Sequence, residues 1–355
     1  MSRPAVPNTN ARRGAVLGLL AAALFGVSAP ISKRLVAEVT PQVLAGLLYA
    51  GAGIGLSIAR ALRPSAAEAR LRRSDAVPLA AMIALGGAIG PVLMLVGLRR
   101  VTAVAGSLLL NLEAPFTILV ALLLFREHLG RRGLLSAALI LGGAAVLGFA
   151  PGHLRADLPG TLCIAGACLC WALDNNLTQR LTVRDPLTIV RLKALAAGGL
   201  NLAIGLAWGG RLPSPGIVLA ALALGSVSYG LSVLLDAHAL RLVGAAREAA
   251  YFATGPFLGA IASTLILGER IQALDAVAMA VMAAGVVVLV RERHSHQHTH
   301  DALEHDHIHV HDEHHAHEHA AGDPPGEPHT HVHRHAPLAH DHVHVSDLHH
   351  RHEHS

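Results

Sequence analysis

The sequence predicts an all-α integral membrane protein, with ten transmembrane helices arranged as two inverted five-helix repeats and a disordered C-terminal tail. Of its 355 residues, 52% are hydrophobic and 15% are charged, against about 25% charged in a typical soluble domain. Stretches without Asp, Glu, Lys or Arg recur along the chain, and about 20 such residues cross a bilayer core. One segment also recurs about 140 residues later. A water-soluble fold is excluded, because it could not bury this much apolar surface.

Ten helices are predicted because the uncharged stretches are separated by short links, which leave no room for a soluble domain before the tail. Nine stretches are free of Asp, Glu, Lys and Arg, and one further span, 101–125, is broken only by Glu113. In lipid the backbone polar groups must be satisfied within the chain, and the weak period-2 alternation argues against a β-barrel, so each stretch is expected to be helical. We expect helices at 14–36, 41–60, 76–98, 101–125 and 133–150 in the first repeat (14–150), and at 159–181, 186–208, 215–238, 244–267 and 272–290 in the second repeat (159–291).

The basic residues predict the orientation, because cytoplasmic loops carry an excess of Lys and Arg. With residues 1–13 placed inside, 17 cations of the body fall on the cytoplasmic side and 7 on the opposite side. This bias predicts a multi-pass protein of the bacterial inner membrane with both termini cytoplasmic and a linker (151–158) between the repeats. No cleavable signal peptide is expected, since the first apolar stretch continues as a full span without a small-residue cleavage pattern.

The chain also repeats itself: residues 97–129 are similar to residues 239–271, with one gap. Both segments start with basic residues, carry Pro-Phe in mid-span and have a Glu just past the apolar run. Five spans per repeat is an odd number, so we expect the repeats to be inverted relative to each other, which permits alternating access. The matched positions are Pro115–Phe116 with Pro256–Phe257, and Glu127 with Glu269.

These residues resemble the EamA-type repeat of the drug/metabolite transporter superfamily, and the resemblance covers about residues 14–290. Pro30 and Lys33 also fit the family pattern, whereas residues 23–26 read Ala-Leu-Phe-Gly where many members have Trp-Gly. The resemblance implies a secondary transporter of small solutes. It leaves the solute open, because the superfamily moves amino acids, nucleobases, sugars, quaternary amines and drugs.

An ionisable group within a span is costly and indicates a functional site. Glu113 lies midway along the fourth predicted helix, two residues after Asn111 and just before Pro115. The missing N–H of Pro115 frees a carbonyl one turn back, close to the carboxyl group. Glu113 is therefore a candidate proton or cation carrier. The alternative is a protonated carboxyl that hydrogen-bonds to Asn111 or the backbone and only holds helices together.

A second set of polar residues lies near the cytoplasmic ends of the sixth to ninth predicted helices. By the rise per residue, they are roughly 10–14 Å from the inner boundary of the bilayer core. We predict that they form an inner gate and part of the solute path, with ion pairs that break and form as the repeats move. The alternative is a permanent ion-pair layer. The set comprises Asp174, Asn175, Asn176, Arg191, Lys193, Asp236, His238, Arg247 and Glu248.

All three cysteines fall in the sixth predicted helix, which excludes a disulfide framework. Packing as small apolar residues is the simpler interpretation for Cys163, Cys168 and Cys170. The alternative is a zinc site, because Cys163, Cys170 and Asp174 are spaced to lie within about 40° on one helix face.

The tail (292–355) differs sharply from the body. It holds 23 of the 26 histidines, and residues 294–355 carry −9 against +13 for residues 1–293, which together give the overall +4. In an extended chain each His-X-His offers two imidazoles to one ion, so we predict that the tail binds Zn, Ni, Co or Cu. Its polar, Pro-interrupted composition predicts disorder. Alternatives are a pH sensor or an inert solvated tail. The candidate ligands are His294, His296, His298, His300, His305, His307, His309, His311, His314, His315, His317, His319, His329, His331, His333, His335, His340, His342 and His344.

Three functions compete at this point. The first is an exporter of metabolites or drugs whose tail senses metal or pH; the second is a Zn, Ni or Co transporter fed by its tail; the third is a membrane-tethered metal buffer. An enzyme is not expected, since the spans show no Ser-His-Asp set, phosphate loop or closed metal triad. Its partners are the bilayer and a small solute or ion, with no cofactor required. Nucleic acid is not expected, because topology and anionic headgroups explain the basic loop at 60–73.

Overall fold

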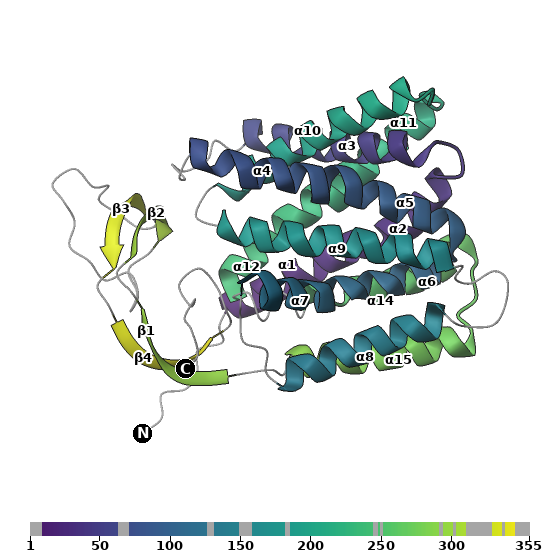
Figure 1. Ribbon diagram of the computed structural model, residues 1–355. Coiled ribbons are helices and arrows are strands. Elements are labelled where there is room, and N and C mark those ends of the chain that lie inside the picture. The colour runs from purple at the N-terminus through teal and green to yellow at the C-terminus, as the bar shows by residue number, and fades with distance from the viewer. Residues whose placement is uncertain are drawn as a thin grey trace.

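A computed structural model describes residues 9–62, 71–125, 131–148, 158–181, 185–243, 248, 251–290, 294–300, 303–309, 329–335 and 338–344. The body is a bundle of helices that run back and forth side by side (Figure 1). The first half contains α1 (Thr9–Gly26), α2 (Ser28–Leu35), α3 (Pro41–Leu62), α4 (Ala76–Met82), a π-helical segment (Ile83–Ile89), α5 (Gly90–Arg100), α6 (Ala103–Leu109), a 3₁₀ turn (Leu110–Leu112), α7 (Glu113–Phe125) and α8 (Arg131–Gly148). A further 3₁₀ turn (Arg73–Asp75) precedes α4.

The second half follows the same order of helices. It contains α9 (Leu158–Arg180), α10 (Pro186–Ala207), α11 (Pro215–Leu224), a second π-helical segment (Gly225–Leu231), α12 (Ser232–Val243), α14 (Gly255–Leu267) and α15 (Ala273–Val290). Local chemistry explains several boundaries. Asp185 caps α10 by accepting from Leu187 N at 3.0 Å, and Gly268 ends α14 with a φ of 68° that suits glycine.

Helix occupies all ten predicted ranges, but not every range is one continuous helix. The first is interrupted at Val27, three residues before Pro30, and the ninth at Ala253–Thr254, just before Pro256. Continuity across these ranges was therefore predicted wrongly. A proline removes a backbone donor and clashes with the preceding turn, which accounts for both breaks.

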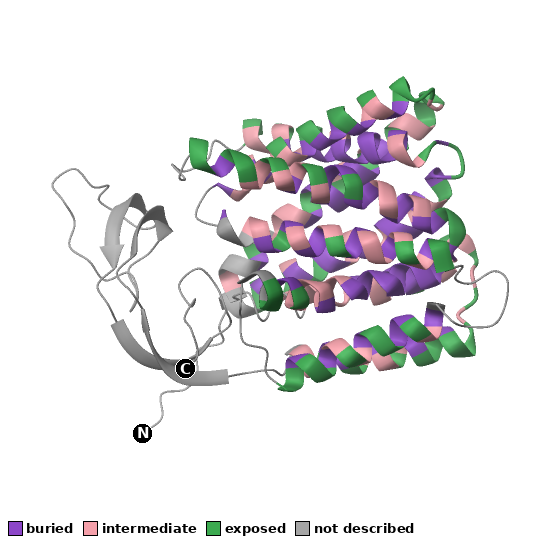
Figure 2. Cartoon of the chain, in the orientation of Figure 1, coloured by how far each residue is buried: buried purple, intermediate pink, exposed green. Residues whose placement is uncertain are grey.

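Seven helices within the described residues are long and apolar enough to cross a membrane, and Gly255–Leu267 and Ala273–Leu289 are shorter apolar helices. A multi-pass membrane protein is thus established by these helices, whereas the number of ten spans stays a prediction. Large apolar side chains such as Leu123 and Leu265 are exposed at 67% and 81% on the outside of the bundle. Figure 2 shows the same pattern, with buried residues inside and exposed residues around the rim. Such a surface requires lipid around it.

The helices of the two halves pack on each other symmetrically, so each contact has a counterpart in which the halves change roles. The second helices of the halves pack together as α3 and α10, and the fifth as α8 and α15. The first helix of each half packs on the third helix of the other, α1 on α12 and α9 on α5. This interlocked arrangement places the interior between the two halves rather than within either one.

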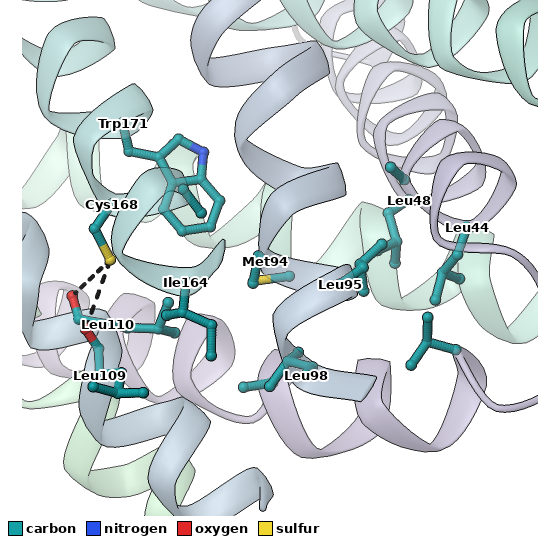
Figure 3. Close-up of a cluster of buried hydrophobic side chains, with 14 of the residues drawn as sticks. Leu44, Leu48, Met94, Leu95, Leu98, Leu109, Leu110, Ile164, Cys168 and Trp171 are labelled. Carbon is teal, nitrogen blue, oxygen red and sulfur yellow. Dashed lines mark hydrogen bonds between the residues drawn. The ribbon is translucent and has the colours of Figure 1, made fainter. Parts of the chain in front are cut away.

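Glycines allow the closest of these approaches, between α3 and α10. A Cβ added to Gly198 would lie 2.6 Å from the Ala50 nitrogen, and one added to Gly46 would lie 2.7 Å from the Leu202 nitrogen. The two backbones are therefore in direct contact. Beside them lies an apolar cluster that includes Leu44, Leu48, Met94, Leu95, Leu98 and Ile164 (Figure 3).

Four segments of the tail form strands. β1 (His294–His300) pairs antiparallel with β4 (Leu338–His344), and β2 (Leu303–His309) pairs antiparallel with β3 (His329–His335). Disorder throughout the tail was predicted, so these strands correct that prediction. The His-X-His alternation has the period of two of an extended strand, which is consistent with this backbone. Other candidate ligands, such as His314 and His319, lie outside the described residues.

Candidate functional site

An ion pair between Asp174 on α9 and Lys193 on α10 lies inside the bundle. The two side chains are only 5% and 16% exposed. The second carboxylate oxygen of Asp174, Oδ1, is buried and has no hydrogen-bond partner among the residues that the structure describes. A buried charge needs a partner because desolvation is costly. Lys193 therefore keeps Asp174 charged in the interior, and one acceptor oxygen remains unused.

The first π-helical segment supplies the wall beside this pair. The carbonyl of Gly86 accepts from the Tyr49 hydroxyl at 2.8 Å and from the Trp171 indole N–H at 3.0 Å. A side chain on Gly86 would collide with the Asp174 carboxylate, and one on Gly87 would lie 2.6 Å from Ala197 Cβ. π-Helical turns occur often at functional sites. Here the turn brings α3, α9 and α10 together around one glycine pair.

Glu113 lies beside α9 and is linked to it by a short hydrogen bond. Asn175 Nδ2 donates to Glu113 Oε1 at 2.6 Å, and Asn176 Nδ2 donates to the Thr117 carbonyl at 3.3 Å. Both bonds join the second half of the chain to α7 of the first. Asn111 is not part of this contact, because its amide donates to the Leu108 carbonyl at 3.0 Å. Among the described residues no hydrogen bond joins Asn111 to Glu113, and the alternative that Glu113 only holds helices together stays a prediction.

Two carboxyl groups face each other between α12 and the segment at residue 248. The side chains of Asp236 and Glu248 lie within hydrogen-bonding reach of each other. A carboxylate only accepts, so such a bond requires a proton on one of the two groups. One oxygen of each, Asp236 Oδ1 and Glu248 Oε1, is buried and has no hydrogen-bond partner within the described part of the chain.

The structure thus shows which residues of the predicted polar set contact each other, which the sequence did not specify. Arg191 is half-buried, and its Nε has no hydrogen-bond partner. His238 is exposed, with Nδ1 2.7 Å from the Leu234 carbonyl oxygen. Arg247 lies outside the described residues. Within the described part of the set, Asp174 and Lys193 are the acid and base that form an ion pair.

The cysteines do not build a metal site in the described spans. Cys168 is buried, and its Sγ lies 3.7 Å and 3.8 Å from the carbonyl oxygens of Leu109 and Leu110 (Figure 3). Among the residues that the structure describes, no three His, Cys, Asp or Glu side chains gather to hold a metal. The zinc alternative for Cys163, Cys170 and Asp174 is therefore not supported.

Sequence analysis missed Tyr49, Trp171, Gly86 and Gly87. The adjacent glycines at 86–87 give no specific signal for the π-helical segment, because the pairs at 142–143 and 198–199 lie in regular α-helix. The two aromatic donors carry no local signal either. Their role depends on which carbonyl the neighbouring helix presents.

Comparison with known proteins identifies the family of this chain. The model of the EamA-like transporter family matches twice, at residues 12–149 and 158–291. The chain belongs to the EamA-like transporter family. An uncharacterized transporter of Methanothermobacter thermautotrophicus is 31% identical over 287 residues, which is 76% of this chain and 84% of the relative. An uncharacterized protein of Pseudomonas aeruginosa, PA1977, is 35% identical over 174 residues, which is 48% of this chain and 58% of that protein.

A crystal structure supports the fold of this EamA-like chain. It superposes with a TM-score of 0.60 at 21% identity and covers 78% of this chain and 98% of its own. At that identity the likeness concerns the fold alone. In this EamA-like transporter, the polar contacts of α9 connect to α7, to the π-helical segment beside α5 and to α10, and so involve both halves.

Proposed function

We propose that the protein exports small solutes across the bacterial inner membrane by alternating access, through ten spans in two inverted repeats with both termini cytoplasmic. Family membership supports a transporter of small solutes. The observation that carries the proposal is the contact set around α9, in which Asp174 pairs with Lys193 while the adjacent Asn175 pairs with Glu113 of the other half. Movement of one half relative to the other would have to break the hydrogen bond between Asn175 and Glu113.

The ion pair provides a way to bind a charged solute. Separating Asp174 from Lys193 inside the bundle leaves two buried charges, which is strongly unfavourable. A solute that offers a charged or hydrogen-bonding group replaces the lost partner, so separation is favoured only when solute is present. The unpartnered Asp174 Oδ1 is the first acceptor available to such a group. Catalysis forms no part of this proposal.

Transport by reconstituted protein tests the assignment. Vesicles are assayed with one labelled probe of each class: an amino acid, a nucleobase, a sugar and tetraethylammonium. We expect the wild type to move at least one probe, and Asp174→Asn and Lys193→Met to lower that rate more than tenfold. Arg60→Gln is the matched control, because Arg60 also forms an ion pair, with Asp185 at 3.3 Å, but is 33% exposed. Unchanged transport by both interior variants would refute the assignment.

We also propose that the tail binds a divalent transition metal, Zn, Ni, Co or Cu. Strand register supports this second candidate. His296 pairs with His342 in one sheet and His307 with His331 in the other, and directly opposed residues lie on the same face of a two-stranded sheet. Imidazole is a common ligand of these metals.

Cellular metal content separates the remaining functions. Elemental analysis is performed on cells with the intact gene, with Asp174→Asn and with residues 292–355 deleted, under zinc, nickel and cobalt loads. No change in any strain supports the solute exporter. A change caused by Asp174→Asn supports a metal transporter fed by the tail. A change caused by the deletion alone supports a membrane-tethered metal buffer.

A further inference from the structure

At one end of the bundle the carboxylate of Glu269 joins the end of α14 to the start of α6. This residue follows α14 directly after Gly268. Its oxygens accept from Ala103 N and Val104 N, both at 2.9 Å, although the residues are 165–166 positions apart in sequence. Ala103 and Val104 are the first two residues of α6, whose N–H groups have no partner within the helix. A carboxylate there also interacts favourably with the helix dipole.

Lys33 makes the complementary contact at the same end. Its Nζ donates to the carbonyl oxygens of Leu98 at 2.7 Å and Val101 at 2.5 Å. These carbonyls belong to the C-terminal end of α5, where helix acceptors lack intrahelical partners. Among the described residues no direct ion pair joins Lys33 to Glu269, but the two opposite charges lie near enough to attract each other. The pair therefore connects α2, α5, α6 and α14, and each charge is matched to the helix end of opposite polarity.

Close backbone packing lies beneath this pair. A Cβ added to Gly259 would lie 2.6 Å from the Gly26 oxygen and 3.0 Å from Ser107 Oγ. Ala105 and Leu108 on α6 are 1% and 0% exposed. The helices α1, α6 and α14 are thus in direct contact at this level. A solute has no room to pass between these residues while the contacts hold.

One residue of the polar cluster, Asn175, lies toward the other end of the bundle. Asn175 is exposed, and it lies five residues before the end of α9 at Arg180. An amide that faced lipid at this depth would be costly, so its exposed surface indicates access to water. The Glu269 end is therefore closely packed, and the exposed Asn175 lies near the opposite end of α9.

We propose that Glu269 and Lys33 form the gate that closes this end of the bundle, which faces outward in the proposed orientation. This inference rests on the proposed alternating access. Opening the gate transfers one carboxylate, one ammonium and the helix-end groups to water, which replaces their hydrogen bonds. Such contacts can break and form repeatedly, because water offsets most of the loss.

Thiol labelling of the full-length protein tests the gate. Ser107→Cys is introduced where the three native cysteines are replaced by Ala, and a membrane-impermeant maleimide is added from the Glu269 side. Glu269→Gln removes the charge that holds α6 while keeping the side-chain size. We expect it to raise the labelling rate about tenfold, because charge-assisted hydrogen bonds are about twice as strong as neutral ones. Glu269→Asp should restore part of the protection.

Asp275→Asn is the matched control. Asp275 Oδ2 also accepts a backbone N–H, from Gln272 at 2.9 Å, but this bond lies within the start of α15 and joins no second span. We expect labelling within twofold of the unsubstituted reporter. Gel filtration verifies folding, and Lys33→Met is the second variant if Glu269→Gln does not fold; it should also raise labelling.

The outcomes separate the gate from the proposed function. Labelling needs no solute, so an error in the assigned solute does not affect it. Equal labelling with and without Glu269→Gln, in folded protein, overturns the gate while leaving export possible by another route. A gate variant that labels fast, with no transport of any probe by the wild type, supports the gate and counts against the proposed export.

Discussion

Replacing Gly86 with Ala is predicted to destabilise the protein, although Ala is the better helix former. Inside a helix, Gly→Ala ordinarily gains about 1 kcal/mol. At residue 86 the new methyl group would collide with the Asp174 carboxylate and would lie 2.7 Å from Asp174 Cβ. Overpacking typically costs about 1–3 kcal/mol, and displacing Asp174 also weakens its buried ion pair with Lys193, where losing a partner costs about 3–5 kcal/mol. A partial displacement therefore leaves a net loss of about 1–3 kcal/mol.

Two other helical glycines provide matched controls. A Cβ added to Gly142 in α8 or to Gly199 in α10 would meet no atom within 4 Å. There the gain in helix propensity is unopposed, so Ala should be neutral or stabilising by up to about 1 kcal/mol. The free energy of unfolding is measured in detergent micelles by SDS titration, followed by tryptophan fluorescence. The sign of the change distinguishes residue 86 from the controls.

A double variant identifies the cause. If the collision with Asp174 is responsible, Gly86→Ala combined with Asp174→Ala should be more stable than the sum of the two single effects, because the smaller side chain makes room for the methyl group. Equal stabilisation by Ala at residues 86, 142 and 199 would refute the reasoning. So would a loss at residue 86 that is strictly additive with Asp174→Ala.

Three further substitutions have defined outcomes. Tyr49→Phe removes the 2.8 Å bond to the Gly86 carbonyl but leaves that of Trp171, so we expect a loss of about 1 kcal/mol in the same SDS titration; no loss would mean that the bond is not maintained. Asp185→Ala removes the cap of α10 and should cost about 1–2 kcal/mol, whereas Arg60→Gln removes only a partly exposed ion pair and should cost less than about 1 kcal/mol. The reverse order would contradict this assignment. Asn201→Leu removes the 2.8 Å bond with Gln42 between α10 and α3 and should lower the thermal midpoint of the purified protein; an unchanged midpoint would exclude a contribution from this bond.

Helix positions were predictable because lipid imposes a local requirement on every span. An uncharged run of sufficient length must satisfy its own backbone, and a helix does so within the run. The errors occurred where a second local rule acted, as at Val27 and at Ala253–Thr254 beside prolines. The tail was less predictable than the helices. Its polar composition predicted disorder, whereas four segments of the tail pair as strands.

The sequence was sufficient to select residues of the candidate site, but not to predict which of them contact each other. Rarity of ionisable groups in apolar helices is enough to select Glu113, Asp174 and Lys193. Which of them touch depends on the rotation of each helix about its axis. Asn175 contacts Glu113 over 62 residues of sequence separation, whereas its neighbour Asp174 turns to Lys193 on α10.

Apolar runs, the recurring Pro-Phe and Glu positions and the cluster of histidines are properties of short segments, and they were sufficient for a two-repeat membrane transporter with a His-rich tail. The partner of Trp171 lies 85 residues away, and those of Glu269 lie 165–166 residues away. No local pattern encodes such contacts, because they require the two halves to pack against each other at one distance and one rotation. Glu269 accordingly marks the repeat in the sequence, and in the folded protein it joins the end of α14 to the start of α6.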